Sequence, residues 1–175
     1  DAKGYPIVDT DKFPDMKAMT AKARSLGLAA GWYGNNCACK ETRPECAWGS
    51  TSPESDMCFA GDVNATLDFG YSSIKIDSCG IQRNMTHYAQ LFNRSGKAVM
   101  LENCHNGNPY HPTRVAGDRV DCPMNFFRTS GDIRPQWGSI LSNLMTTSEF
   151  NAGLAGPGCY GYPDMLEVGV SQMPA

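Results

Sequence analysis

Long apolar runs and clusters of basic residues are both missing from this sequence of 175 residues. No run approaches the ~20 apolar residues that a membrane-spanning helix needs. The net charge is -3 and no stretch is rich in lysine and arginine, so nucleic acid is not expected as a partner. The length and composition predict a globular protein with one sizeable core, corresponding to about one domain.

The sequence signatures of several enzyme classes are also absent. No GxGxxG or GxxxxGK[ST] follows a predicted strand, which disfavours a nucleotide-binding open sheet. HExxH does not occur, and His87, His105 and His111 are too scattered to form a ligand set, so we predict no metal and no other cofactor. The GxSxG elbow of a Ser-His-Asp hydrolase is missing as well.

Cysteine, in contrast, is abundant: the chain has eight, without CxxC…CxxC spacing. This usage predicts disulfides and an oxidising compartment. Glycosylation sequons at Asn64, Asn84 and Asn93 agree with that prediction. We therefore expect the protein outside the cell, in the secretory pathway, or in a lysosome or vacuole. The first residues do not resemble a signal peptide, so either a leader has been removed or the sequence begins within a longer one.

Helices and strands are predicted to alternate along the chain. Helical spacing of apolar residues, with proline and glycine at the ends, predicts helices over 13–27, 56–70, 82–96 and 137–150. Short apolar runs predict strands over 26–36, 71–80, 97–104 and 124–133, and the intervening segments 37–58, 105–123 and 156–165 are expected to be loops.

This alternation is typical of parallel sheets with right-handed crossovers, so the fold class is α/β. An open doubly wound sheet and a closed (β/α)8 TIM barrel both fit, and the missing nucleotide-binding loops favour the barrel. A complete barrel usually needs about 250 residues. The chain is therefore expected to hold only a partial set of the strands.

Charged residues interrupt the predicted strand "SIKID". Alternation along a strand would turn Ile74 and Ile76 toward the helices and Lys75 and Asp77 toward the opposite face. At the carboxyl end of a barrel strand, that face opens into the active-site mouth. These charges therefore predict a site.

Two further strand ends repeat the pattern, with Glu102 and His105 on one and Arg128 and Asp132 on the next. Any single pair could be an ordinary ion pair, but three successive charged strand ends favour a functional site. Two carboxylates across a sugar-sized gap suit glycoside hydrolysis. Lys75 is expected to keep Asp77 ionised.

The motifs "KFPD", "SLGLAAGWY", "IKIDSC", "RTSGDI" and "GPGCYGYPDMLEVG" occur in that order, over a stretch from about Phe13 to Gly169. In this the chain resembles the alpha-galactosidase (melibiase) family, glycoside hydrolase family 27. The resemblance implies a (β/α)8 barrel and hydrolysis with retention of anomeric configuration. It also implies that residues 1–175 are part of one catalytic domain and hold about strands 3 to 7 of its barrel, while the first two strands and the C-terminal portion are not in the chain.

The resemblance assigns roles to individual residues. Asp77 matches the nucleophile that forms the glycosyl-enzyme intermediate, and Asp132 matches the general acid/base. Other residues match side chains that line or bind the sugar; these are Lys75, Arg128, Tyr33, Asp164 and Met165. Tyr33 and Met165 could instead be core residues, given their apolar setting.

Two motifs depart from the family. Where many members have "CEW", this chain has Cys104 followed by His105, with Glu102 before them, so either Glu102 or His105 would read the sugar's second carbon. "WNDPDM" is replaced by "YGYPDM". Alpha-galactose, alpha-N-acetylgalactosamine and beta-L-arabinopyranose are all compatible with the catalytic pair.

The resemblance also implies a disulfide pattern. Cys104 would pair with Cys122, and Cys79 with Cys37 or Cys39. The remaining cysteines would staple the loop over 37–58.

Two functions stay open at this point. The first is a retaining exo-glycosidase acting on a terminal galactoside. The second is an inactive, galactosidase-like structural or carbohydrate-binding subunit of an extracellular or membrane-associated assembly. Retention of both carboxylates and both cations favours the enzyme. The rest of the polypeptide or a partner subunit would complete the barrel, and a homodimer is compatible with the sequence.

Overall fold

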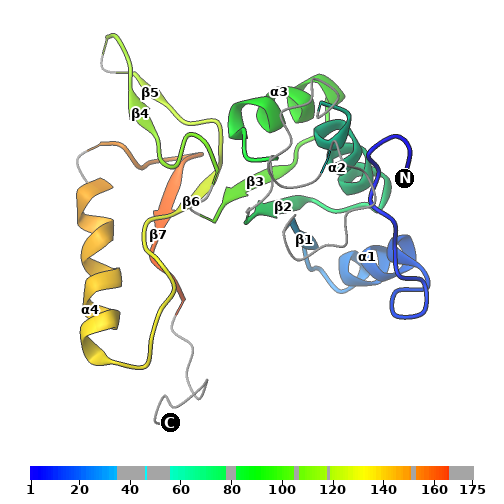
Figure 1. Ribbon diagram of the computed structural model, residues 1–175, viewed down its shortest axis with the longest axis horizontal. Helices are drawn as coiled ribbons and strands as arrows, with labels where there is room; N and C mark the ends of the chain where they lie inside the picture. Colours follow the sequence, from blue (N-terminus) through cyan, green and yellow to red (C-terminus); the bar gives the residue numbers. More distant parts are fainter. Residues whose placement is uncertain are drawn as a thin grey trace.

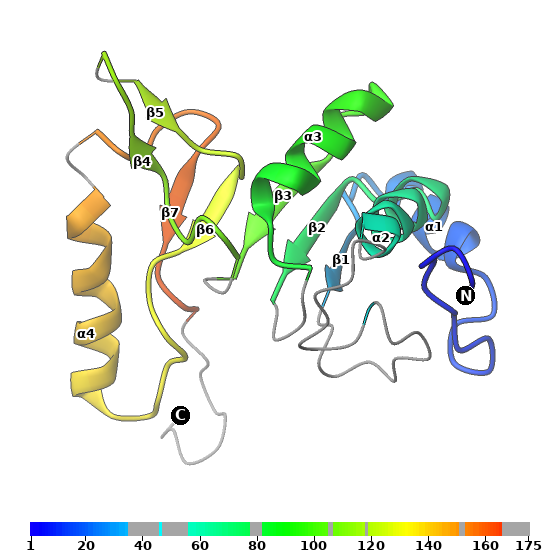
Figure 2. The same ribbon diagram turned by 45° about the horizontal axis from the view of Figure 1, so that its top comes forward.

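The computed structural model describes residues 1–34, 46, 56–77, 82–104, 107–117, 119–150 and 153–165. Its main feature is a parallel sheet of five strands in the order β1-β2-β3-β6-β7 (Figure 1). The strands are β1 (Gly31–Gly34), β2 (Ser73–Ile76), β3 (Met100–Asn103), β6 (Phe126–Arg128) and β7 (Tyr160–Tyr162). All five carboxyl ends lie at the lower edge of the sheet in Figure 2. The predicted α/β class with a parallel sheet is confirmed.

Helices precede or follow the strands where the apolar spacing predicts them. They are α1 (Met16–Ser25), α2 (Asp56–Asp68), α3 (Met85–Ser95) and α4 (Trp137–Thr146), which continues into the 3-10 helix η3 (Thr147–Phe150). The Asn84 side chain accepts a hydrogen bond from the His87 amide and begins α3, and Gly96 ends it with a left-handed φ of 67°. No helix in the described residues has the length and apolarity needed to cross a bilayer.

The core lies between the sheet and helices α2 and α3. Ile74 and Ile76 are 1% and 2% exposed and pack in one cluster with Tyr88 and Phe92 of α3. Burying each side chain of this size contributes about 1.5–3 kcal/mol. The predicted alternation along "SIKID" is therefore confirmed: the isoleucines face the helices, and the charged residues between and after them do not.

The chain between 156 and 165, predicted to be a loop, contains β7 instead. Strand β7 extends the sheet because the amide of Tyr160 donates to Asn125 O, and the amide of Thr129 donates to Tyr162 O, both at 2.8 Å. A Cβ on Gly161 would lie 2.9 Å from Cζ of Phe127, so glycine permits the close pairing. Local turn signals dominate this short segment, and only pairing with β6 makes it a strand.

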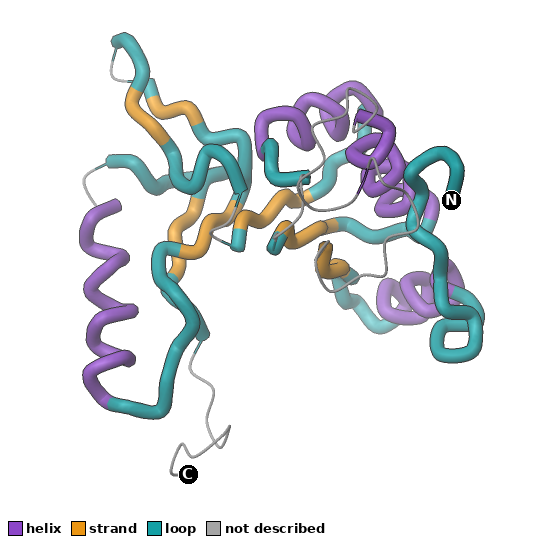
Figure 3. The backbone as a smooth tube through the Cα atoms, viewed as in Figure 1, coloured by secondary structure: helices purple, strands orange, loops and turns teal. Residues whose placement is uncertain are grey.

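The predicted loop before β6 also has structure. Strands β4 (Thr113–Arg114) and β5 (Val120–Asp121) form an antiparallel hairpin that projects from the body of the molecule (Figure 3). Among the described residues between β3 and β6, this hairpin stands where a crossover helix would be expected. Two-residue strands carry too little alternation to be recognised in a sequence.

Two disulfides occur in the described residues, Cys46–Cys58 and Cys122–Cys159. The predicted Cys104–Cys122 bond is wrong, because Cys104 is a free, buried thiol. The topology gives the reason: Cys104 follows the carboxyl end of β3, whereas Cys122 and Cys159 precede β6 and β7 at the opposite edge of the sheet. The predicted bond from Cys79 to Cys37 or Cys39 lies outside the described residues.

Candidate active site

One row of polar side chains crosses the sheet near its carboxyl edge. The register aligns Tyr33 of β1 with Lys75 of β2, and Lys75 with Glu102 of β3. Register partners in parallel strands point to the same face, and this face is opposite to the one that Ile74 and Ile76 bury. The sheet therefore gathers these three side chains on the side that helices α2 and α3 leave open.

Asp77 lies directly after β2 and is held by its neighbour on β1. The phenol of Tyr33 donates a hydrogen bond to Oδ2 of Asp77. The Asp77 amide donates to Gly34 O at 2.9 Å, which extends the strand ladder and fixes the backbone of Asp77. Tyr33 is 51% exposed, so the alternative interpretation of Tyr33 as a core residue is wrong.

Lys75 makes its ion pair across the sheet. Its Nζ lies 3.2 Å from Oε1 of Glu102, and the two side chains are 24% and 29% exposed. The phenol of Tyr162, at the end of β7, donates to the same carboxylate oxygen. The Lys75 ammonium also lies 6.0 Å from the centre of the Tyr162 ring. We predicted that Lys75 keeps Asp77 ionised; the carboxylate that Lys75 contacts directly is that of Glu102.

Arg128 joins two further aspartates. Its Nη2 lies 2.9 Å from Oδ1 of Asp132, and its Nη1 lies 3.3 Å from Oδ1 of Asp164. The Arg128 side chain is 8% exposed, whereas that of Asp132 is 87% exposed. Burial opposes the charged form of Arg128, but its interactions with Cys104, Asp132 and Asp164 outweigh burial and raise its pKa above the usual value. Asp132 is therefore an accessible carboxylate tethered to a buried cation.

Asp164 fixes the loop that carries Asp132. Its Oδ2 accepts a hydrogen bond of 2.7 Å from the Ile133 amide, and its own amide donates to Oγ of Ser130 at 2.8 Å. Asp164 follows β7, and the loop follows β6. These contacts hold the two strand ends together beside Arg128.

The Cys104 thiol lies among these groups. Its pKa is raised mainly by burial, while Lys75 and Arg128 act in the opposite direction and Asp77 adds to the increase. Cys104 follows β3, the middle strand of the sheet. Among the groups that shift its pKa, Lys75 is on β2 and Arg128 is on β6, the two strands beside β3.

Two predicted site residues are not part of these clusters. His105 lies outside the described residues. Met165, at the end of the described chain, is 67% exposed, so the interpretation of Met165 as a core residue is wrong. The sequence analysis missed Tyr162. It lies two residues before Asp164, and that spacing puts both on one face of an extended segment, which is the signal that would have identified it.

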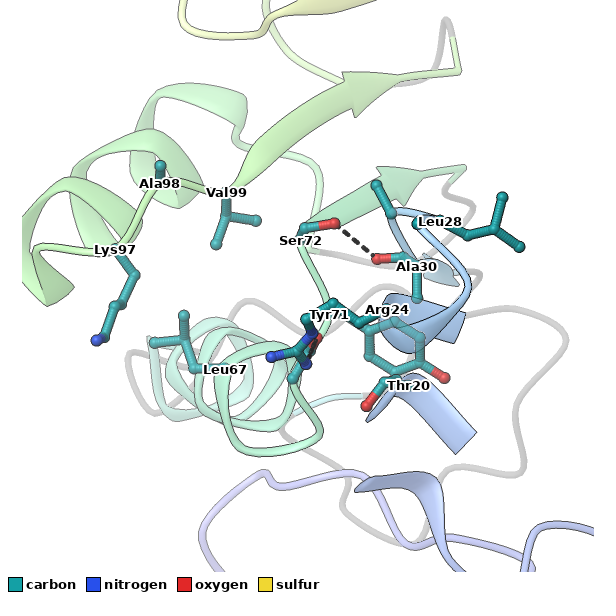
Figure 4. A pocket seen from close by; sticks show the side chains of 13 residues that line it. Thr20, Arg24, Leu28, Ala30, Leu67, Tyr71, Ser72, Lys97, Ala98 and Val99 are labelled. Carbon is teal, nitrogen blue, oxygen red and sulfur yellow. Dashed lines mark hydrogen bonds between the residues drawn. The ribbon is translucent and has the colours of Figure 1, made fainter. Parts of the chain in front are cut away.

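A pocket of about 600 Å³ lies at the opposite edge of the sheet (Figure 4). Its lining includes Leu67, Tyr71, Ser72 and Val99, at or near the amino ends of β2 and β3, and it has no carboxylate. Arg24, also in the lining, donates to Gly70 O at 3.1 Å. In barrels of parallel strands, chemistry occurs at the carboxyl ends and the amino ends serve stability, so the clusters described above are the better candidate.

The chain is similar over nearly its whole length to several known glycosidases. An alpha-galactosidase of Oryza sativa subsp. japonica is 29% identical over 177 residues, which cover 97% of this chain and 39% of the relative. The chain resembles the alpha-galactosidases. Alpha-galactosidase A of Homo sapiens is 27% identical, over 97% of this chain and 40% of its own length. The family resemblance predicted from the motifs is thereby confirmed.

The similarity extends to one related activity and is limited in length. An alpha-N-acetylgalactosaminidase of Gallus gallus is 25% identical, over 97% of this chain and 42% of the relative. No protein-family model matches the chain. The chain spans about two fifths of the length of the curated relatives it matches.

Proposed function

We propose that this chain is part of a retaining exo-glycosidase that removes terminal alpha-galactose-type residues from glycans or glycosides. The observation that carries the proposal is the pairing of two carboxylates with fixed neighbours at one edge of the sheet. Asp77 is held by Tyr33, and Asp132 is held by Arg128. The names of the similar proteins support the choice of sugar.

A partial (β/α)8 barrel is the architecture that we propose around this site. The five strands follow one another in chain order without the reversal that marks an open doubly wound sheet. One face packs on α2 and α3, and the other carries the polar row. Strands β1 and β7 are the two edges, where further strands, from the rest of the polypeptide or from a partner subunit, would pair.

In the proposed reaction, an oxygen of Asp77 attacks the anomeric carbon while Asp132 gives its proton to the departing glycosidic oxygen. Water then attacks the glycosyl-enzyme, Asp132 takes the proton from that water, and the bond to Asp77 breaks. The backbones of β2 and β6 are two strand spacings apart, about 10 Å. Asp77 directly follows β2 and Asp132 lies four residues beyond Arg128, the last residue of β6. Retention requires their carboxyl groups to be about 5–5.5 Å apart.

The remaining predicted residues would bind the sugar. Lys75 and Arg128 supply hydrogen-bond donors for hydroxyl groups, and Tyr33, Asp164 and Met165 would line the sugar pocket. Glu102 or His105 would read the second carbon, and this choice separates galactose from N-acetylgalactosamine. Arabinopyranose remains a third candidate substrate.

The covalent chemistry of the chain supports an oxidising location. Two disulfides are present among the residues that the structure describes, and the sequon residues Asn64, Asn84 and Asn93 are all exposed. We propose that the protein is a glycoprotein that is secreted or resides in a lysosome or vacuole.

The test is turnover of an aryl alpha-galactoside by the complete protein. Asp77→Asn and Asp132→Asn should each lower kcat on the order of 10³-fold or more. Asp121→Asn, which changes an exposed aspartate of the hairpin, is the matched control and should have no effect. Normal activity in Asp77→Asn would overturn the nucleophile assignment. Galactose binding without turnover by the unmodified protein would favour the carbohydrate-binding alternative.

A further inference from the structure

Tyr162 contacts the polar row of Tyr33, Lys75 and Glu102, although it lies on β7, the edge strand opposite to β1. It ends β7, and β6 lies between β7 and β3, the strand of Glu102. Its phenol nevertheless reaches across β6 and donates to Oε1 of Glu102. Glu102 is thus fixed from two sides, by Tyr162 and by the Lys75 ammonium 3.2 Å from the same oxygen.

The two contacts leave the carboxylate of Glu102 asymmetric. Both donors approach Oε1, and within the described part of the chain no donor contacts Oε2. Glu102 is also partly accessible, with 29% of its side chain exposed. A carboxylate oxygen that is oriented and accessible is a good acceptor for a hydroxyl group.

Tyr162 is suited to this task because its phenol remains protonated. Burial and the hydrogen bond to Glu102 both raise the pKa of Tyr162 above the usual value, so the hydroxyl stays a donor at neutral pH. The Lys75 ammonium has three protons; its contacts with Glu102 and with the Cys104 thiol use two, which leaves one donor for a ligand on the same side of the sheet.

We infer that Tyr162 is a positioning residue: together with Lys75 it holds one oxygen of Glu102 and presents the other to a hydroxyl group of the bound sugar. The inference rests on the proposed glycosidase function and deepens it. Of the two candidates named above, Glu102 and His105, it assigns Glu102 as the acceptor that reads a sugar hydroxyl.

The test is Tyr162→Phe in the complete protein, assayed with an aryl alpha-galactoside and its monodeoxy analogues. Loss of the phenol should raise KM about tenfold for the parent substrate, with kcat nearly unchanged, because a contact made equally in the ground and transition states is lost. For the one analogue that lacks the hydroxyl read by Glu102, the variant and the unmodified protein should have the same KM. Glu102→Gln should raise KM for the parent substrate and should likewise have no effect on this analogue.

Tyr160→Phe is the matched control, since Tyr160 lies on the same strand, is 47% exposed and packs its ring against Phe126. It should leave every substrate unaffected, and both variants should keep the melting temperature of the unmodified protein. An unchanged KM in Tyr162→Phe, or an equal loss on all analogues, would overturn the inference.

Failure of the proposed function can be separated from failure of this inference. If the complete protein hydrolyses no galactoside, calorimetric binding of galactose and of its monodeoxy analogues replaces the rates. The same pattern of dissociation constants would support the role of Tyr162. The absence of any galactose binding, or equal weakening for all sugars in Tyr162→Phe, would contradict it.

Discussion

The phenol of Tyr33 donates a hydrogen bond to the carboxylate of Asp77 and so joins the ends of two neighbouring strands. The parallel register makes this contact: Tyr33 is aligned with Lys75, and Asp77 is the next residue on that face of β2. A nucleophilic carboxylate must keep one orientation toward the anomeric carbon. In the proposed reaction Asp77 is that carboxylate, and Tyr33 would hold its orientation from the edge strand of the sheet.

Tyr33→Phe should therefore lower kcat/KM about tenfold, because a hydrogen bond to a charged group is lost. Stability should change little, since half of the Tyr33 side chain is exposed. Steady-state kinetics on an aryl alpha-galactoside measure the effect. Tyr110→Phe serves as the control, because Tyr110 lies in the segment after β3 and is 52% exposed, nearly the same as Tyr33. Equal kinetics for the two variants would refute the role of Tyr33.

Asp164→Ala should destabilise the protein by about 3 kcal/mol, because the buried Arg128 loses one of its carboxylate partners. The change also removes the acceptor of the Ile133 amide. Urea denaturation of the complete protein would show the loss as a lower midpoint.

Asp9→Ala is the control for that measurement. Asp9 pairs with Lys12 at 3.1 Å, but both side chains are largely exposed, at 49% and 76%. Exposed pairs are worth about 0–1 kcal/mol, so this variant should unfold near the midpoint of the unmodified protein. Similar midpoints for Asp164→Ala and Asp9→Ala would show that the Arg128 cluster contributes nothing to stability.

The disulfide arrangement predicts a definite peptide map. Digestion without reduction should release one peptide pair linked through Cys122 and Cys159, and a separate peptide with an unpaired Cys104. Mass spectrometry identifies both products. A peptide pair linked through Cys104 and Cys122 would restore the pattern that the family resemblance implies.

Breaking that disulfide should have a large effect on stability. The bond closes a loop with a sequence separation of 37 residues, which corresponds to about 4 kcal/mol of chain entropy. Cys159→Ser should therefore lower the urea midpoint strongly. A midpoint equal to that of the unmodified protein would mean that the bond does not constrain the unfolded chain.

Cys104 should resist alkylation in the folded protein. Its raised pKa, caused first by burial, lowers the thiolate fraction at any pH below the new value, and only the thiolate reacts. Iodoacetamide at pH 8 should leave Cys104 unmodified until denaturant is added, and the native rate should rise as the pH increases. Rapid labelling of the native protein at pH 8 would contradict the buried, protonated thiol.

Local patterns in the sequence predict the part of the fold that local rules govern. Period-two alternation in "SIKID" correctly separates Ile74 and Ile76 from the charged face, and capping residues such as Asn84 correctly begin a helix. The same rules cannot find β7, whose three residues include glycine and precede proline. Its strand conformation exists because β6 offers it hydrogen-bond partners.

In the candidate site, too, some residues can be predicted from local patterns and others depend on how the strands pair. Strand ends identify Lys75, Asp77, Arg128 and Asp132, because charge in a buried strand is visible in the sequence. The contact of Tyr162 with Glu102 spans 60 residues and depends on the order of the strands, which no local pattern encodes. The predicted Cys104–Cys122 disulfide is wrong for a related reason, because pairing depends on which edge of the sheet each cysteine occupies.

The most direct test of the central claim is covalent trapping of the nucleophile in the complete protein. A fluorinated galactosyl fluoride that forms a slowly hydrolysed glycosyl-enzyme would be added, and the labelled peptide would be identified by mass spectrometry. We expect a single adduct on the carboxylate of Asp77. This adduct should be absent from the Asp77→Asn variant. A label on another carboxylate, or steady turnover with no covalent adduct, would contradict it.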